Sequence, residues 1–213
     1  MDFIPQDIND YCENHSKKET AVLEELNRHT HVNVLRPRML SGHLQGKLLE
    51  MLSMMIQPES VLEIGTYTGY SAICLAKGLK ENGKLITIDC DEEQEDLALE
   101  FFEKAGFSDQ ITLKIGQALD LIPKLKESFD LVFLDADKAN YLNYYQLVFD
   151  QVKRGGYIIA DNVLWSGKVV EPLKPGDKET KAILDFNQFV QEDPRVENVL
   201  LPFRDGLMVV KKK

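Results

Sequence analysis

The stretch SVLEIGTYTGYS, residues 60–71, decides the fold. Its first five residues are a short, mostly apolar run of the kind that forms a buried strand, and Gly65 follows directly. A helix is expected to begin near Ser71. A strand, a glycine loop and a helix in this order form the first part of a βαβ unit, which builds a parallel sheet.

The same alternation continues along the chain. Further apolar runs occur at residues 84–89, 111–115, 131–135 and 157–160, with helical stretches at 92–104, after Asn140 and at about 178–191. Asp91 is the expected cap of the second helix and Gly106 its stop. The runs 196–202 and 206–210, joined by PFRDG, predict an antiparallel hairpin. The predicted fold is α/β: a Rossmann-like, seven-stranded, mostly parallel sheet with helices on both faces and a C-terminal antiparallel hairpin.

The first 57 residues are expected to form an N-terminal helical arm. Apolar residues recur at helical spacing within residues 18–28, and again at Leu44, Leu48, Leu52 and Met55. Ser41 is the expected N-cap of the latter helix. We expect residues 1–213 to form a single domain, with a helical extension at 1–57 and the Rossmann-like core at 58–213.

Composition limits the class of protein and its partners. The 213 residues are 44% hydrophobic and 28% charged, the balance of a globular chain. The 25 basic and 35 acidic residues give a net charge of −10, which disfavours a diffuse nucleic-acid binder. No apolar run approaches the roughly 18 residues of a membrane span. The N-terminus has no signal-peptide pattern, so we expect a cytoplasmic protein.

The glycine loop predicts a nucleoside ligand without a pyrophosphate. Tyr67 occupies the middle glycine position of the dinucleotide fingerprint GxGxxG, which is therefore not met. Glu63 would repel a phosphate and suits a sulfonium or an amino group. Asp89, at the end of the second predicted strand, is placed to accept a ribose hydroxyl. S-adenosylmethionine carries both a positive charge for Glu63 and a ribose for Asp89. The alternative is that Gly65 and Gly69 only make a tight turn.

Acidic residues follow the fourth and fifth predicted strands. Asp135 closes the fourth strand, and Asp161 and Asn162 close the fifth. Carboxylate and amide oxygens at adjacent strand ends favour Mg²⁺ or a similar ion. Asp137 and Lys138 follow on the same loop, where a lysine can act as a general base. The alternative is that these acids are helix caps or solvated loop residues.

Three segments carry a resemblance to a known family. VLEIGTYTGYSA, FLDADKANYLNYY and ADNVLW resemble the class I, metal-dependent, S-adenosylmethionine-dependent O-methyltransferases. The branch of caffeoyl-CoA O-methyltransferase is the more similar one, and catechol O-methyltransferase is more distant. The resemblance runs from about Arg38 to the final hairpin.

The resemblance implies a role for each matching residue. Asp135, Asp161 and Asn162 would hold the metal, and Lys138 with Asp135 would form the catalytic pair. Trp165 and Ser166 would contact the acceptor together with Lys138, although Ser166 stands where plant enzymes tend to have Asn. The cofactor contacts would be Met39, Ser41, Glu63, Gly65, Thr66, Tyr70, Ser71, Asp89, Gln117, Ala118, Asp135 and Asp137.

The expected activity is methyl transfer to a small phenol with vicinal hydroxyls. S-adenosylmethionine is the expected donor, and Mg²⁺ is the expected metal, with Mn²⁺ or Ca²⁺ as alternatives. The same chemistry on 5-hydroxyuridine in transfer RNA is the first alternative, and it predicts a basic rim from Arg28, Arg36, Arg38 and residues 211–213. The second is a non-catalytic nucleoside-binding protein on this fold. The resemblance also implies a homodimer.

Overall fold

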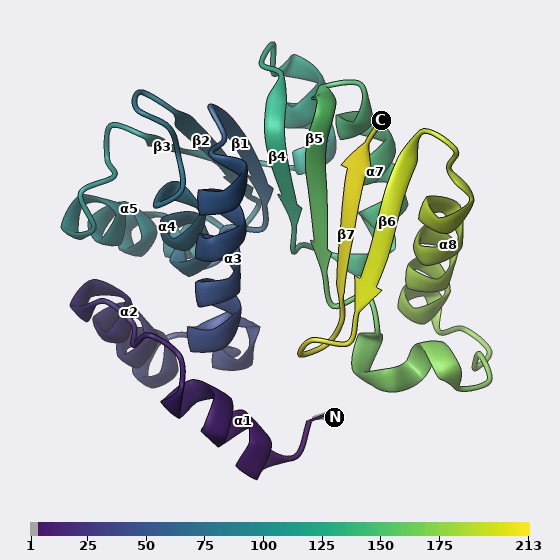
Figure 1. Ribbon diagram of the computed structural model, residues 1–213, viewed down its shortest axis with the longest axis horizontal. Coiled ribbons are helices and arrows are strands. Elements are labelled where there is room, and N and C mark those ends of the chain that lie inside the picture. The colour runs from purple at the N-terminus through teal and green to yellow at the C-terminus, as the bar shows by residue number, and fades with distance from the viewer. Residues whose placement is uncertain (1–3) are drawn as a thin grey trace.

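Seven strands form one sheet in the computed structural model, which describes residues 4–213. Their order is β3-β2-β1-β4-β5-β7-β6 (Figure 1). The first five strands are parallel to one another, whereas β7 runs antiparallel to both β5 and β6. The predicted Rossmann-like sheet with its closing hairpin is therefore confirmed. The strands are β1 (Ser60–Ile64), β2 (Lys84–Asp89), β3 (Ile111–Ile115), β4 (Phe129–Leu134), β5 (Val152–Asp161), β6 (Val196–Leu201) and β7 (Leu207–Lys212).

Helices cover both faces of the sheet, as predicted. Alternate residues of β1 face opposite sides: Val61 packs with residues of α2 to α5, and Leu62 packs with residues of α6 to α8. No helix within residues 4–213 is long and apolar enough to cross a membrane. The α-helices are α1 (Gln6–Asn14), α2 (Ala21–Asn33), α3 (Gly42–Ile56), α4 (Tyr70–Ala76), α5 (Glu95–Lys104), α6 (Ala118–Leu121), α7 (Tyr141–Phe149) and α8 (Lys178–Glu192).

The predicted helical arm is present as α1, α2 and α3, and α3 begins directly after Ser41. The prediction that the Ser41 side chain caps α3 is wrong. Ser41 has helical backbone angles (φ −56°, ψ −39°), and its hydroxyl makes no capping bond to any described residue. A capping serine needs an extended backbone, from which its oxygen can reach the first free N–H groups.

The boundaries of β4 and β5 differ from the prediction. β4 ends at Leu134, so Asp135 follows the strand and does not close it. β5 begins at Val152 and not at residue 157. Gly155 and Gly156 interrupt the apolar pattern there, and the register between β4 and β5 shifts between Phe129 and Leu131. Glycines at such a bulge hide the first part of a strand from a pattern of apolar residues.

The register brings the functional loops to one edge of the sheet. Ile64 pairs with both Ile88 and Leu134, and Leu134 pairs with Ala160. The carboxyl ends of four parallel strands are therefore level. The residues at or just beyond these ends are Gly65, Asp89, Asp135 and Asp161.

A buried carboxylate joins α7 to the connection between α8 and β6. Asp193 accepts hydrogen bonds from Arg195 Nε (2.8 Å) and Nη2 (2.6 Å), and from the Tyr145 hydroxyl (3.0 Å). The pKa of Asp193 is lowered to about 2, mainly by the hydrogen bonds from the Arg195 guanidinium. The ion pair therefore stabilises the fold only while Asp193 is ionised.

Asp193→Asn tests this contribution, because asparagine keeps an acceptor for Tyr145 and loses the charge. We expect the free energy of unfolding at pH 7 to fall by about 1–2 kcal/mol. The expected loss is small for a charged pair because Arg195 is half-exposed and water screens its charge. The folded pKa lies below the unfolded one, so the difference from wild type should disappear as the pH falls from about 4 towards 2. Urea unfolding at a series of pH values measures it. Asp185→Asn, which removes an exposed pair with Lys181, is the matched control; a difference that stays constant with pH would contradict the assignment.

Candidate active site

A cavity of about 870 Å³ opens at this edge of the sheet. Loops that follow the five parallel strands line it, and residues 36–41, which we call the covering segment, line it from the N-terminal part of the chain. Every predicted site residue except Glu63 and Ser166 is on its wall. These residues are Met39, Ser41, Gly65, Thr66, Tyr70, Ser71, Asp89, Gln117, Ala118, Asp135, Asp137, Lys138, Asp161, Asn162 and Trp165.

The glycine loop passes very close to the loop that follows β4. Gly65 has φ +104°, and a Cβ atom built on it would lie 2.0 Å from the carbonyl oxygen of Asp135. Both the backbone angle and the space therefore require glycine. The two loops are consequently fixed against each other by backbone contact.

Asp89 organises the glycine loop as well as the cavity wall. One carboxylate oxygen accepts from the Tyr67 N–H (2.7 Å), and the other accepts from the Asp91 N–H (2.9 Å). Carboxylate oxygens have further lone pairs, so these bonds leave capacity for a ligand hydroxyl. Asp89 is thus held in one orientation at the cavity wall.

Glu63 lies behind the cavity wall and is fully buried. Its Oε2 accepts from the Thr87 hydroxyl (2.6 Å), which is also bonded to the Thr66 hydroxyl (2.5 Å) on the wall. Its Oε1 has no hydrogen-bond partner within the described residues. Burial raises the pKa of Glu63 to about 8. A buried acid with an orphaned oxygen suits a cationic ligand group nearby, although the structure does not place Glu63 on the cavity wall.

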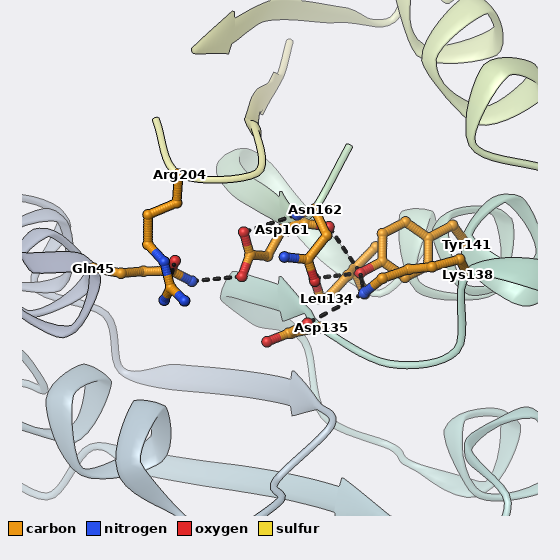
Figure 2. A network of polar contacts seen from close by, with 8 residues as sticks. All are labelled: Gln45, Leu134, Asp135, Lys138, Tyr141, Asp161, Asn162 and Arg204. Atoms are coloured by element: carbon orange, nitrogen blue, oxygen red, sulfur yellow. Dashed lines mark hydrogen bonds and ion pairs between the residues drawn. The ribbon is translucent and has the colours of Figure 1, made fainter. Parts of the chain in front are cut away.

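Lys138 and Tyr141 lie beside Asp135 and Asp161, on the side opposite Gln45 and Arg204 (Figure 2). Its Nζ is 3.2 Å from Asp135 Oδ1 and donates to the Tyr141 hydroxyl at 2.6 Å. The Tyr141 hydroxyl in turn donates to the main-chain carbonyl of Asp161 at 2.9 Å. Lys138 is only 8% exposed. A buried amine held in this way has a fixed position at the cavity wall.

Asp161 is buried and held by two donors. Its Oδ1 accepts from the Asn162 N–H (2.8 Å), and its Oδ2 accepts from Gln45 Nε2 (2.6 Å). Burial, and next the negative charge of Asp135, raise the pKa of Asp161. The negative charge of Asp135 thus disfavours ionisation of Asp161, and a cation between the two side chains would remove that penalty.

The donor set fits a hard divalent ion that keeps part of its water shell. Within residues 4–213 no three His, Cys, Asp or Glu side chains form a group that could hold a metal. The candidate set has only two carboxylates, and Asn162 would add an amide oxygen. Mg²⁺ is commonly held by one or two carboxylates together with water and substrate oxygens. Asp135, Asp161 and Asn162 therefore suit this kind of site.

The predicted acceptor contacts are only partly brought together. Trp165 lines the cavity, and its buried indole N–H has no acceptor among residues 4–213. Ser166 is exposed and off the wall; its N–H donates to Asp205 Oδ1 (2.5 Å). Its left-handed backbone (φ 54°) turns the chain at this point. Asparagine is among the residues that adopt that conformation most readily.

Two other predicted cofactor contacts are fixed by side-chain bonds. Asp137 accepts from Asn140 Nδ2 (2.6 Å) and from the Tyr144 hydroxyl. The Tyr70 hydroxyl donates to Glu19 Oε1 (2.5 Å), which ties the cavity wall to the chain before α2. Both residues therefore have defined positions before any ligand binds.

Sequence reasoning missed Gln45, Tyr141, Arg204 and Asp205. Tyr141 belongs to the motif FLDADKANY, and its place three residues after Lys138 could have indicated a partner for that lysine. Arg204 and Asp205 belong to the hairpin link PFRDG and line the cavity. Gln45 lies on α3, where its polar side chain is 1% exposed. Nothing in the local pattern indicates the contact of Gln45 with Asp161, 116 residues away.

Comparison with known proteins places this chain in a family. The family model described as O-methyltransferase matches residues 13–213. Caffeoyl-CoA O-methyltransferase 1 of Eucalyptus globulus is 39% identical over 178 residues, which are 79% of this chain and 72% of that protein. Caffeoyl-CoA O-methyltransferase 5 of Nicotiana tabacum is 37% identical over 179 residues, which are 79% of this chain and 75% of that protein.

Solved structures show the same fold. The O-methyltransferase from Bacillus cereus in complex with SAH has a TM-score of 0.90 and 30% identity, with 97% of each chain covered. TomG of Streptomyces achromogenes, an O-methyltransferase involved in tomaymycin synthesis and solved with SAM, has a TM-score of 0.89 and 27% identity, with 97% of this chain and 96% of that chain covered. With two carboxylates, an amide and a lysine at the ends of β4 and β5, the chain belongs to the O-methyltransferase family, as a member of its caffeoyl-CoA O-methyltransferase-like branch.

Proposed function

We propose that this O-methyltransferase transfers the methyl group of S-adenosylmethionine to one hydroxyl of a small phenol with vicinal hydroxyls, with a divalent metal. One observation carries the proposal. Asp135, Asp161 and the buried Lys138 face the same cavity as the glycine loop and Asp89. A methyl donor and a hydroxyl acceptor can therefore meet in one enclosure.

We place the methyl donor at the part of the cavity that the loops after β1 and β2 line. The loop at Gly65 lets the backbone approach a ligand closely, Asp89 suits a ribose diol, and Glu63 suits a positive charge. The similar proteins from Bacillus cereus and Streptomyces achromogenes were solved with SAH and SAM, respectively. Gly65 and Asp89 on the cavity wall would hold and orient the donor, with Glu63 buried behind them.

The metal is proposed at Asp135, Asp161 and Asn162, with Mg²⁺ as the expected ion and Mn²⁺ or Ca²⁺ as alternatives. When bound, such an ion lowers the pKa of a coordinated hydroxyl. Lys138 Nζ, fixed by Asp135 and Tyr141, would take the proton from that hydroxyl. Trp165 would position the ring of the acceptor. A cytoplasmic location and a homodimer stay predictions.

The transfer-RNA alternative needs a basic rim at the cavity. Arg36 and Arg38 do line it. Lys212, however, donates to the carbonyls of Phe149 and Val152, at the start of β5 and opposite its cavity end. The C-terminal lysines therefore do not join a rim with the arginines. This arrangement and the net charge of −10 favour the phenol.

Asp89→Asn should weaken cofactor binding. The variant keeps the size of the side chain but loses the charge that would accept the ribose hydroxyls. Loss of a charge-assisted hydrogen bond corresponds to about 10- to 150-fold in affinity. Titration calorimetry with S-adenosylmethionine measures it, and Asp109→Asn, an exposed acid away from the cavity, is the control. Unchanged affinity in a folded Asp89→Asn protein would place the ribose elsewhere.

Chelation should abolish methyl transfer and leave the cofactor bound. The proposed metal ligands follow β4 and β5, whereas most of the cofactor contacts follow β1 to β3. The assay offers caffeic acid, caffeoyl-CoA, a catechol and an undermodified transfer-RNA pool, each with EDTA and with Mg²⁺. We expect methylation of the phenols only with Mg²⁺. Full activity in EDTA would exclude the metal from the proposed function. Preferential methylation of the RNA would favour the transfer-RNA alternative.

Lys138→Ala should slow the chemistry without unfolding the protein. We expect kcat to fall by about 10²- to 10⁴-fold, the usual contribution of a general base. The loss should shrink as the pH rises, because more of the acceptor hydroxyl then ionises without help. Steady-state kinetics across pH measure both effects, with the exposed Lys181→Ala as control. Wild-type kcat at neutral pH would exclude Lys138 from proton transfer.

A further inference from the structure

Arg204 links three separate parts of the chain. It lies in the turn between β6 and β7 with a left-handed backbone (φ 49°). Its Nη1 donates to Gln45 Oε1 at 2.9 Å and to the carbonyl of Ser41, and its Nη2 donates to the carbonyl of Leu40 at 3.3 Å. The hairpin turn is thereby attached to the covering segment and to α3. Figure 2 shows the Arg204 side chain pointing towards Gln45.

The bonds of Arg204 all go to uncharged oxygens. Among the described residues it forms no ion pair with an acid. A planar guanidinium donates in several fixed directions at once, which suits it to hold a backbone segment. A simple surface arginine would instead leave these carbonyls to water.

Gln45 connects Arg204 to Asp161. Its Oε1 accepts from Arg204, and its Nε2 donates to Asp161 Oδ2 at 2.6 Å. A guanidinium can only donate and an ionised carboxylate can only accept, so the amide of Gln45 fits between them in one orientation. With Oδ1 held by the Asn162 N–H, both oxygens of Asp161 have fixed directions.

We propose that Gln45 and Arg204 are positioning residues for Asp161. Gln45 orients the carboxylate that would bind the metal, and Arg204 fixes the Gln45 amide while it attaches the covering segment to the same point. This inference rests on the proposed function, in which Asp161 is a metal ligand. Neither residue contacts the reacting atoms.

The test is Mn²⁺ binding by the full chain, measured by calorimetry for wild type, Gln45→Met, Arg204→Met and the double variant. Methionine keeps the length of glutamine and makes no comparable hydrogen bonds. We expect Gln45→Met to weaken Mn²⁺ binding by about 10- to 100-fold, the usual effect of losing a partner of a metal ligand. Arg204→Met should weaken it less. The double variant should be no weaker than Gln45→Met, because Arg204 acts on Asp161 only through Gln45.

Binding of SAH separates the two roles. Arg204→Met frees the covering segment and should weaken SAH binding, whereas Gln45→Met keeps the bonds from Arg204 to Leu40 and Ser41 and should leave it unchanged. Arg154→Met removes an exposed arginine from β5 and should change neither ligand. Thermal unfolding of each variant without ligands checks the fold. Arg204 is exposed, so we expect Arg204→Met to fold. Its Mn²⁺ and SAH binding therefore test the inference even if Gln45→Met does not fold.

The outcomes distinguish this inference from the proposed function. If wild type does not bind Mn²⁺, the metal in the proposed function is wrong and the positioning role is overturned with it. If wild type binds Mn²⁺ but both single variants bind equally well, only the positioning role is overturned. The positioning role is also overturned if the losses of Mn²⁺ affinity in the two single variants add in the double variant. A loss in the double variant no larger than that in Gln45→Met supports the positioning role.

Discussion

The close approach of Gly65 to the Asp135 carbonyl is the constraint on which the site depends. A Cβ atom at residue 65 would lie 2.0 Å from that oxygen, so the loops after β1 and β4 meet backbone to backbone. The Asp135 N–H also donates to the Ile64 carbonyl at 2.9 Å, which continues the sheet one step past β4. Residues that would hold the donor and residues that would activate the acceptor therefore lie at a spacing set by the main chain. Positioning of this quality is what a direct transfer between two bound molecules requires.

The same edge of the sheet concentrates negative charge that the protein only partly offsets. Asp89 is held by backbone N–H groups, and Asp135 by Lys138, but the pKa values of Glu63 and Asp161 are raised by burial. Groups with raised pKa values cost free energy when they ionise in the empty protein. A cationic donor and a divalent ion would remove this cost, so ligand binding and stability should be linked. A cavity of this charge is consistent with small cationic ligands.

The sequence predicted features that depend on local pattern and missed those that depend on distant contacts. The strand–loop–helix alternation predicted the sheet, and the residues at the strand ends predicted Gly65, Asp89, Asp135 and Asp161 on the cavity wall. The start of β5 escaped because Gly155 and Gly156 break the apolar run, and Ser41 failed as a cap because its backbone is helical. Gln45 and Arg204 act across 116 and 159 residues of chain. Their contacts follow from the folded topology, which no periodicity encodes.

In the proposed function the acceptor would lie beside Trp165, in a part of the cavity that is built differently from the rest. Its lining includes Trp165, Glu179, Arg204 and Asp205, which come from the connection between β5 and α8, the start of α8 and the hairpin turn. None of these lies on a central strand, so each can change without disturbing the contact at Gly65. In the proposed function, the rigid strand ends would therefore carry the chemistry of methyl transfer, whereas the loops supported by the sheet would determine the choice of acceptor. Because Arg204 also contacts Gln45, changes near Trp165 and the hairpin turn would reach Asp161, the proposed metal ligand, through Gln45.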